Sequence, residues 1–349
     1  MNQFLRLFAI AISLWLVFIA PPSTLLALLN DLPFYTWLLT SLLFIPLPLL
    51  LFASVFRLKN SLFRWWVFQY LGISAISFSA AGVGALLSLL IEESKAGQVA
   101  IALFVVFCIV AIHAAHRIHL VPLTITSSKL LRPQRLVQIS DVHIGSRQPA
   151  FLEKIISLVD EQQPDMLLIT GDLIDENVAV ESLKPLAGLA YPVFYCSGNH
   201  ERYVDYRNAL NNIASHGVSV LNDGAAISNG IHILGIEDRQ HVSQAQKVLT
   251  TLRASSESSP EPFRVLLYHQ PDLWASAVDQ GIDLMLSGHT HKGQIWPFGW
   301  LVRVRYKHVA GHFQSALSHL FVSQGTGTWG PIFRFGTRCE ITVIELHPE

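Results

Sequence analysis

Apolar residues are concentrated in the first 120 positions of the chain, and this asymmetry limits the possible folds more than any other feature. Charged residues make up only 14% of the 349 residues, whereas soluble domains carry roughly 25%. The apolar excess lies in four stretches, at about residues 4–29, 33–56, 67–91 and 98–120. Each exceeds the roughly 20 residues that a helix needs to cross about 30 Å of hydrocarbon. The sequence therefore predicts an all-α transmembrane anchor of four helices within residues 1–120.

The flanks of these stretches indicate how the anchor is inserted. The first stretch could instead be a signal peptide, but no polar cleavage region with small residues follows it. Basic residues collect after the second and the fourth stretch, at Arg57, Lys59, Arg64, Arg117, Lys129, Arg132 and Arg135. Because positively charged flanks stay in the cytoplasm, we expect both termini on the cytoplasmic face of a bacterial inner membrane. The domain that follows the anchor would then also be cytoplasmic.

Several classes of function find no support in the sequence. Ionisable residues in the middle of a membrane span usually mark a transport pathway, and the four stretches carry none there. The net charge of −1 gives no indication of nucleic-acid binding, which usually leaves a basic footprint. The three cysteines, Cys108, Cys196 and Cys339, lack the CxxC spacing of a thiolate metal site. The apolar stretches are therefore interpreted as an anchor and not as a transporter.

The second part of the chain has the alternating pattern of an α/β fold. A polar connector that contains proline is expected at 121–134, followed by a separate domain at 135–349. Short apolar runs there alternate with helix-like segments, as in layered α/β domains. The expected strands are Leu136–Ser140, Met166–Thr170, Val193–Cys196, Ile231–Ile236, Val265–Tyr268, Leu284–Ser287 and Ile341–Leu346. The expected helices are Phe151–Gln163, Val178–Leu189, Tyr206–His216 and Gln244–Arg253, with an exposed loop at Ser255–Pro262.

Five of the expected strands end in short polar motifs. The motifs are Asp141-Val-His143, Gly171-Asp172-Leu-Ile-Asp175, Gly198-Asn199-His200-Glu201, His269 and Gly288-His289-Thr290-His291. In α/β sheets, ligands bind outside the carboxyl ends of the strands, so we expect the motifs to meet at one edge. Their carboxylate, imidazole and amide donors suit Mn²⁺, Fe or Zn²⁺. Two cations that share Asp172 would lower the pKa of a bound water and neutralise charge on a phosphoryl group.

Each motif on its own is a weak signal. A single histidine such as His269 is more often a hydrogen-bonded core residue, and Gly-Asn-His-Glu can be a simple turn. Five motifs in order, each after an apolar strand, are poorly explained by coincidence. Gly171, Gly198 and Gly288 precede ligands where a strand has to turn sharply, which glycine permits at least cost. The histidines expected to be structural or on the surface are His216, His232, His241, His308, His312 and His319.

The ordered set of motifs resembles the calcineurin-like metallophosphoesterases over roughly Leu136 to Leu346. The resemblance implies a four-layer α/β/β/α sandwich with two divalent cations, of which Mn²⁺ is favoured over Fe or Zn²⁺. It implies one cation bound by Asp141, His143, Asp172 and His291, and a second bound by Asp172, Asn199, His269 and His289. It also implies that His200 is a catalytic residue that stabilises or protonates the leaving group. Asp175 would orient the ligands.

Residues near the C-terminus narrow the resemblance. Gly293-Gln294, Gly325–Pro331 and Arg334–Gly336 are similar to the membrane-associated bacterial branch of this family. That branch is often linked with UDP-diacylglucosamine pyrophosphohydrolase activity in lipid A synthesis. The chain departs from it at Lys292, where the branch commonly has Gly, and at Gln324, where it commonly has Arg. Both positions lie beside the motifs, so the resemblance predicts the substrate less directly than it predicts the type of reaction.

The combined prediction is a membrane-anchored hydrolase that cleaves phosphodiester or pyrophosphate bonds with a metal-activated water. Arg147, Arg202 and Lys292 are candidates for binding a second phosphate, or are solvated surface charges. An aromatic group at Trp296, Phe298 and Trp300 could line an apolar entrance for acyl chains or dock the domain on the bilayer. We expect a lipid-linked substrate such as UDP-2,3-diacylglucosamine, with a soluble or cell-envelope phosphodiester as the alternative. A non-catalytic receptor or scaffold, the distant alternative, would be expected to have lost ligands.

Overall fold

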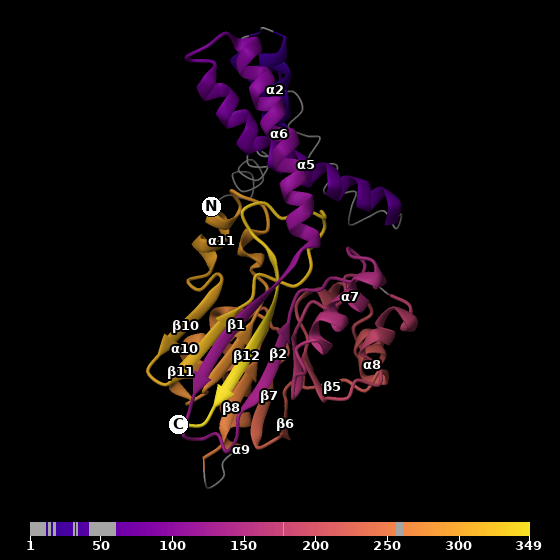
Figure 1. Cartoon of the computed structure of the whole chain (residues 1–349), viewed down its shortest axis with the longest axis vertical. Coiled ribbons are helices and arrows are strands. Elements are labelled where there is room, and N and C mark those ends of the chain that lie inside the picture. The colour runs from indigo at the N-terminus through magenta and orange to yellow at the C-terminus, as the bar shows by residue number, and fades with distance from the viewer. Residues whose placement is uncertain are drawn as a thin grey trace. The chain divides into compact units, whose positions relative to one another are not determined.

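The computed structural model describes residues 12, 15, 16, 19–30, 32, 34–41, 61–176, 178–255 and 261–349. They form two compact units, shown with the whole chain in Figure 1. The first unit contains residues up to Ala115 together with two later segments, Ile295–Phe298 and Gly330–Gly336. The second unit contains His116–Gln294, Gly299–Trp329 and Thr337–Glu349. The chain therefore leaves the first unit after Ala115 and returns to it twice, at Ile295–Phe298 and at Gly330–Gly336.

The helices of the first unit are α2 (Ala20–Leu29), α3 (Phe34–Ser41), α5 (Ser61–Leu87) and α6 (Glu93–His116). Two stretches, Leu62–Leu87 and Glu93–His116, are long and apolar enough to cross a membrane. The third and fourth expected spans correspond to them, although each begins five residues earlier than predicted. The first expected span lies partly outside the described residues and the second mostly outside them; α2 and α3 are the helices described in that region.

The segment expected to be a polar connector contains a strand instead. Ile118–Thr126 form β1, which pairs in parallel with β12 (Cys339–His347) from Ile118 opposite Cys339 to Thr126 opposite His347. This pairing satisfies the backbone of the segment, and Leu123 and Ile125 are buried in the core. The fourth expected helix therefore ends at His116 and not at 120. Only residues 127–133 connect β1 to the next strand.

Two six-stranded mixed sheets form the centre of the second unit. The first has the order β1-β12-β2-β3-β4-β5, with β12 antiparallel to β2 and the other neighbours parallel. The second has the order β10-β11-β9-β8-β7-β6, with antiparallel pairs at its two edges. The remaining strands of the first sheet are β2 (Gln134–Ile139), β3 (Met166–Thr170), β4 (Val193–Cys196) and β5 (Ser219–Val220). Those of the second are β6 (Gly224–Ser228), β7 (Ile231–Gly235), β8 (Phe263–Leu267), β9 (Leu284–Ser287), β10 (Gly311–Ser315) and β11 (Ser318–Val322).

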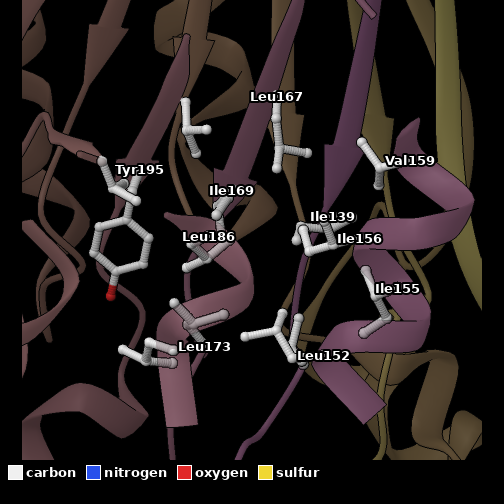
Figure 2. Close-up of a cluster of buried hydrophobic side chains, with 14 of the residues drawn as sticks. Ile139, Leu152, Ile155, Ile156, Val159, Leu167, Ile169, Leu173, Leu186 and Tyr195 are labelled. Atoms are coloured by element: carbon white, nitrogen blue, oxygen red, sulfur yellow. The ribbon is translucent and has the colours of Figure 1, made fainter. Parts of the chain in front are cut away.

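Side-chain alternation along the strands creates separate buried layers. Leu167 and Ile169 of β3 pack with α7 (Pro149–Asp160), as Figure 2 shows. Met166 and Leu168 of the same strand face the second sheet. On the outer side of that sheet, α9 (Val242–Ser255) and α10 (Trp274–Asp279) cover a third apolar layer. The second unit is thus an α/β sandwich of two mixed sheets, with helices on its outer faces.

The other helical elements are short. They are η2 (Val180–Leu186), η3 (His200–Tyr203), α8 (Tyr206–Ser215), η4 (Pro271–Leu273), η5 (His291–Gly293) and α11 (Gly299–Arg305). The expected helix at Val178–Leu189 is a 3₁₀ helix, η2, with Pro185 inside it. Proline lacks an N–H and disrupts an α-helix at its interior, which accounts for the difference. Helices α7 and α8 lie on the same side of the sandwich (Figure 1).

Candidate metal centre

The five predicted motifs converge in the structure. They occupy the loops after β2, β3, β4, β8 and β9, at the carboxyl ends of these strands. One set of potential ligand atoms, from Asp141, His143 and His291, lies within 4.8 Å of one another. A second set, from Asp172, His269 and His289, meets the same criterion. Side chains that are far apart in sequence therefore form two adjacent groups.

The first group combines one carboxylate with two imidazoles. Nε2 of His291 lies 3.2 Å from Oδ1 of Asp141 and 3.0 Å from Nε2 of His143. Nε2 of His143 is also 3.8 Å from Oδ1 of Asp141. Asp141 and His143 are fully buried. Three donor atoms that face each other in a buried space fit a divalent cation that prefers nitrogen and oxygen ligands.

Asp172 lies between the two groups. Its Oδ2 is 3.1 Å from Nε2 of His269 and 4.0 Å from Nε2 of His143. In the second group, Nδ1 of His289 lies 2.8 Å from the Asn199 side-chain oxygen and 3.3 Å from Nε2 of His269. One carboxylate placed between two sets of nitrogen donors is consistent with a dinuclear metal site.

Outer hydrogen bonds fix which imidazole nitrogen faces the centre. Nδ1 of His143 donates to Oδ1 of Asp175 at 2.6 Å, and Nδ1 of His200 donates to the same oxygen at 2.7 Å. Nδ1 of His269 donates to the carbonyl of Thr170 at 2.7 Å. Because Nδ1 is bound to these outer groups, Nε2 is the nitrogen that faces the centre in His143 and His269. Such second-layer bonds are typical of metal-binding histidines.

His200 has an arrangement that fits either of two roles. Its Nε2 lies 3.9 Å from Oδ2 of Asp172, and it forms a third potential ligand group with His143 and Asp172. Its backbone N–H donates to the other Asp172 oxygen at 2.8 Å. The geometry therefore places His200 beside the shared carboxylate, where it could contact a substrate or a cation.

Glu201 has a structural role that the sequence motif did not reveal. Its fully buried carboxylate accepts hydrogen bonds from four backbone N–H groups. These belong to Asp172 at 3.1 Å, Leu173 at 2.7 Å, Ile174 at 3.3 Å and Gly198 at 2.8 Å. One side chain thus joins the loop after β3 to the loop after β4. Its position next to His200 was the only signal that could have found it.

The backbone at the predicted ligands is strained. The φ angles of Asp141, His143, Asp172, His289 and His291 lie between 46° and 68°, a region that residues with a Cβ rarely adopt. Such conformations cost on the order of 1–3 kcal/mol each and cluster at functional sites. Strain concentrated on five predicted ligands indicates that the placement of the ligand side chains determines the backbone conformation of these loops.

Glycine is required at the three motif positions for two different structural reasons. Gly171 has a φ of 83°, as the predicted sharp turn requires. Gly198 and Gly288 do not have a positive φ, so a left-handed backbone is not the reason for glycine at these two positions. A Cβ on Gly198 would collide with Asp172, and a Cβ on Gly288 would collide with Asp141. These two positions need glycine because a carboxylate approaches the backbone closely.

Electrostatics favour charged carboxylates in the centre. Burial alone would raise the pKa of Asp141, but the neighbouring His291 and His269 outweigh it and hold that pKa well below its usual range. Burial lowers the pKa of His200, but Asp172 and Asp175 raise it to about 9. Burial and the positive field of His269 lower the pKa of His289 to about 3. A neutral His289 is the form that binds a cation.

Two of the three predicted phosphate-binding residues are engaged elsewhere. Arg147 is buried, with its guanidinium 3.9 Å above the ring of Phe151. Arg202 forms an ion pair with Glu237 at 2.9 Å. Their positions next to the motifs in sequence did not indicate where the side chains point. Lys292 follows His291 in η5 with a φ of 52° and stays a candidate.

Several residues beside the centre were not predicted. The ring of Tyr203 lies 5.1 Å from that of His200, and the ring of Trp329 lies 5.6 Å from it. On the other side, the ring of Tyr306 lies 5.3 Å from that of His289. The signal available in the sequence was the position of Tyr203 just after the motif at Gly198–Glu201 and that of Trp329 within Gly325–Pro331. The two residues are 72% and 41% exposed.

The remaining predicted positions lie in different surroundings. Gln324, at the departure from the bacterial branch, is buried and donates to Oε2 of Glu340 at 3.1 Å. Trp296 and Phe298 belong to the first unit, where Phe298 packs with Ile295 and Phe333. Trp300 is exposed on α11. Trp300 thus belongs to a different unit from Trp296 and Phe298.

The family model of the calcineurin-like phosphoesterases matches residues 134–293. An uncharacterized metallophosphoesterase of Aquifex aeolicus is 30% identical over 224 residues, and the match covers 61% of this chain and 84% of that protein. The chain belongs to the calcineurin-like metallophosphoesterases. The matched region contains all seven predicted metal ligands of this metallophosphoesterase domain.

Two further relatives extend the comparison. An uncharacterized metallophosphoesterase of Helicobacter pylori is 34% identical over 231 residues, which cover 63% of this chain and 62% of that protein. The chain thus spans about six tenths of the length of that relative. A transmembrane protein with a metallophosphoesterase domain from Danio rerio is 27% identical over 364 residues. That match covers 89% of this chain and 80% of the fish protein, so it reaches beyond the metallophosphoesterase domain.

Proposed function

We propose that the protein is a membrane-anchored, dinuclear metal-dependent hydrolase of phosphodiester or pyrophosphate bonds. The single observation that carries this proposal is the position of Asp172 between two groups of nitrogen donors. Asp141, His143, Asp172 and His291 would hold one cation, and Asp172, Asn199, His269 and His289 the other. Mn²⁺ is the proposed metal, since mixed carboxylate, imidazole and amide ligands suit it.

The two cations, when bound, supply a water of lowered pKa and neutralise negative charge on the phosphoryl group. The residues of the chain position these components and move the proton. Asp175 accepts from Nδ1 of both His143 and His200, and so it sets the direction of both rings. Nε2 of His200 is then the nitrogen available to hydrogen bond with the departing oxygen. We therefore propose His200 as the group that assists the leaving group.

The proposed substrate is an amphiphile with a phosphodiester or pyrophosphate, of the UDP-2,3-diacylglucosamine type. Two long apolar helices and the transmembrane name of the Danio rerio relative support anchoring in a bilayer, where such a substrate resides. The four-helix anchor and the cytoplasmic orientation belong to the same proposal. A soluble phosphodiester is the second candidate, because the metal-binding loops by themselves select only the phosphoryl group.

The orientation rests on fewer charges than the sequence suggested. Arg64 lies within α5 and not in a loop. Lys129 pairs with Asp283 at 2.8 Å and Arg135 with Glu345 at 2.9 Å, so both are part of the folded domain. Arg117, directly after α6, remains as a flanking charge that favours this orientation. Arg57 and Lys59 lie outside the described residues.

Product analysis tests this function. The purified full-length protein would be incubated with Mn²⁺ and either bis(p-nitrophenyl) phosphate or UDP-2,3-diacylglucosamine. We expect nitrophenol from the first, and uridine monophosphate with an acylated sugar phosphate from the second. Release of nitrophenol without turnover of the lipid would favour the soluble substrate. No hydrolysis of either one with any divalent cation would contradict the proposed enzyme.

A further inference from the structure

Two segments that follow the metal-binding motifs in sequence pack on the apolar helices of the first unit. Ile295 and Phe333, one from each segment, are buried with Ala75 and Ile76 of α5 and Ala111 of α6. The ring of Phe335 also lies 4.9 Å from that of Phe107. The helices thus have a packing surface for these segments in addition to any contact with lipid.

Hydrogen bonds make this packing specific. The backbone N–H of Ile332 donates to the side-chain oxygen of Gln69 at 3.1 Å. The backbone N–H of Arg334 donates to the carbonyl of Ala111 at 2.9 Å. Gln69 is only 7% exposed, and a buried amide in an apolar helix is costly unless it is hydrogen bonded. Polar groups of α5 and α6 are therefore used to bind the segment Gly330–Gly336.

Gly72 of α5 provides room for the same segment. A Cβ at this position would lie 2.5 Å from Cβ of Pro331 and 2.6 Å from Cδ2 of Phe333. Real Cβ atoms do not approach other atoms this closely, so a larger residue would displace the segment. At Gly82, ten residues later on the same helix, a Cβ would meet no atom within 4 Å. The close approach is a local property of the Gly72 position.

In the second unit, the two residues that directly precede these segments, Gln294 and Trp329, are hydrogen bonded to each other. The side-chain amide of Gln294 donates to the carbonyl of Trp329 at 2.9 Å and accepts from the Trp329 N–H at 3.0 Å. Ile295 and Gly330 are the next residues in the chain. The ring of Trp329 lies 5.6 Å from that of His200, and Gly327 donates to the carbonyl of Asp141 at 2.9 Å. Trp329 therefore forms a wall beside the proposed catalytic histidine.

We propose that α5 and α6 position Trp329 beside His200 through the segment Gly330–Gly336, so that hydrolysis depends on these helices even for a water-soluble substrate. Gln69 and Gly72 are positioning residues in this scheme, because they act through Trp329. Trp329 itself lies against the ring of the proposed catalytic histidine. The inference rests on the proposed hydrolase function. It differs from simple tethering, in which the helices only bring the enzyme to the membrane.

The segment can transmit a change in packing because its first residue follows Trp329 directly. A displacement of Gly330 and Pro331 therefore acts on the Trp329 backbone before any other part of the site. A misplacement of about 1 Å at a catalytic site can reduce turnover by roughly 10²-fold. If the helices only tether the enzyme, a helix substitution should not change the turnover of a small substrate that reaches the site from solution.

The test compares Gly72→Val with Gly82→Val in the full-length protein in detergent micelles. With Mn²⁺ and bis(p-nitrophenyl) phosphate, we expect kcat to fall roughly 10- to 100-fold in Gly72→Val and to stay close to wild type in Gly82→Val. Bound metal should not change in either variant. Gln69→Leu, which removes the bond to Ile332 without adding bulk, should lower kcat in the same direction. Equal kcat in all variants would overturn the proposal.

A double-mutant cycle with Trp329→Ala separates positioning from a general structural effect. If Gly72 acts through Trp329, adding Gly72→Val to Trp329→Ala should cause no further loss of kcat. Losses that multiply would overturn the proposal. Hydrogen exchange provides a readout that does not need activity. The Trp329 amide should exchange faster in Gly72→Val than in Gly82→Val, and equal exchange would overturn the inference even if the wild-type protein hydrolyses neither substrate.

Discussion

Glu201 is predicted to hold the metal-binding loops together, and Glu201→Gln tests this directly. The glutamine has nearly the same shape, but one carboxylate oxygen becomes an NH₂ group. Each carboxylate oxygen accepts from two backbone N–H groups, so two of them lose their acceptor whichever way the amide turns. An unsatisfied buried N–H costs about 1–3 kcal/mol. The free energy of unfolding of the domain should therefore fall by roughly 2–6 kcal/mol, a large share of a typical total of about 5–15 kcal/mol.

Thermal unfolding in micelles measures this loss, with Glu345→Gln as the matched control. Glu345 pairs with Arg135 at 2.9 Å while 40% exposed, and exposed pairs contribute only about 0–1 kcal/mol. For a domain of this size, each kcal/mol shifts Tm by roughly 2–4 °C, so Glu201→Gln should lower Tm by about 4–24 °C. The comparison should be made in EDTA to exclude stabilisation by bound metal. A Tm for Glu201→Gln equal to that of the control would refute the role assigned to Glu201.

Three further predictions concern the catalytic histidine, the membrane orientation and the substrate. His200→Ala should keep its bound metal while kcat falls by roughly 10²–10⁴, the range for a lost acid–base group; metal analysis that shows a lost ion would make His200 a ligand instead. A reporter fused after Glu349 should be active in the cytoplasm and one inserted at Glu93 outside it, and the reverse pattern would overturn the orientation. In micelles, kcat/KM should be at least about tenfold higher for acylated UDP-glucosamine than for the deacylated form, since each buried CH₂ adds about 0.8 kcal/mol; equal values would contradict the lipid substrate.

The sequence predicted the loops of the metal centre well because each follows a short, buried and mainly apolar strand. Met166–Thr170, Val193–Cys196 and Leu284–Ser287 coincide with β3, β4 and β9. Strands that are buried on both faces give continuous apolar runs, and the ends of such runs are easily seen. Since parallel neighbours end at one edge, the order of motifs along the chain was sufficient to predict where their side chains meet.

Other features depend on contacts that no local pattern encodes. β1 contains Pro122 and is only partly buried, and its partner β12 lies more than 200 residues away in sequence. Its pairing therefore could not be predicted from its own residues. The direction of a side chain is likewise a tertiary property, as Arg147 above Phe151 shows. The packing of Ile295–Phe298 and Gly330–Gly336 on α5 and α6 also joins segments that are distant in sequence.

The shared position of Asp172 is the central claim, and metal stoichiometry tests it most directly. Wild-type protein and Asp172→Ala would be loaded with Mn²⁺, freed of excess metal and analysed for bound metal and for hydrolysis of bis(p-nitrophenyl) phosphate. We predict two ions per chain in the wild type, and in Asp172→Ala at most one ion and no detectable hydrolysis, because the carboxylate between the two groups is removed. An Asp172→Ala protein that retains both ions and full activity would contradict the dinuclear account.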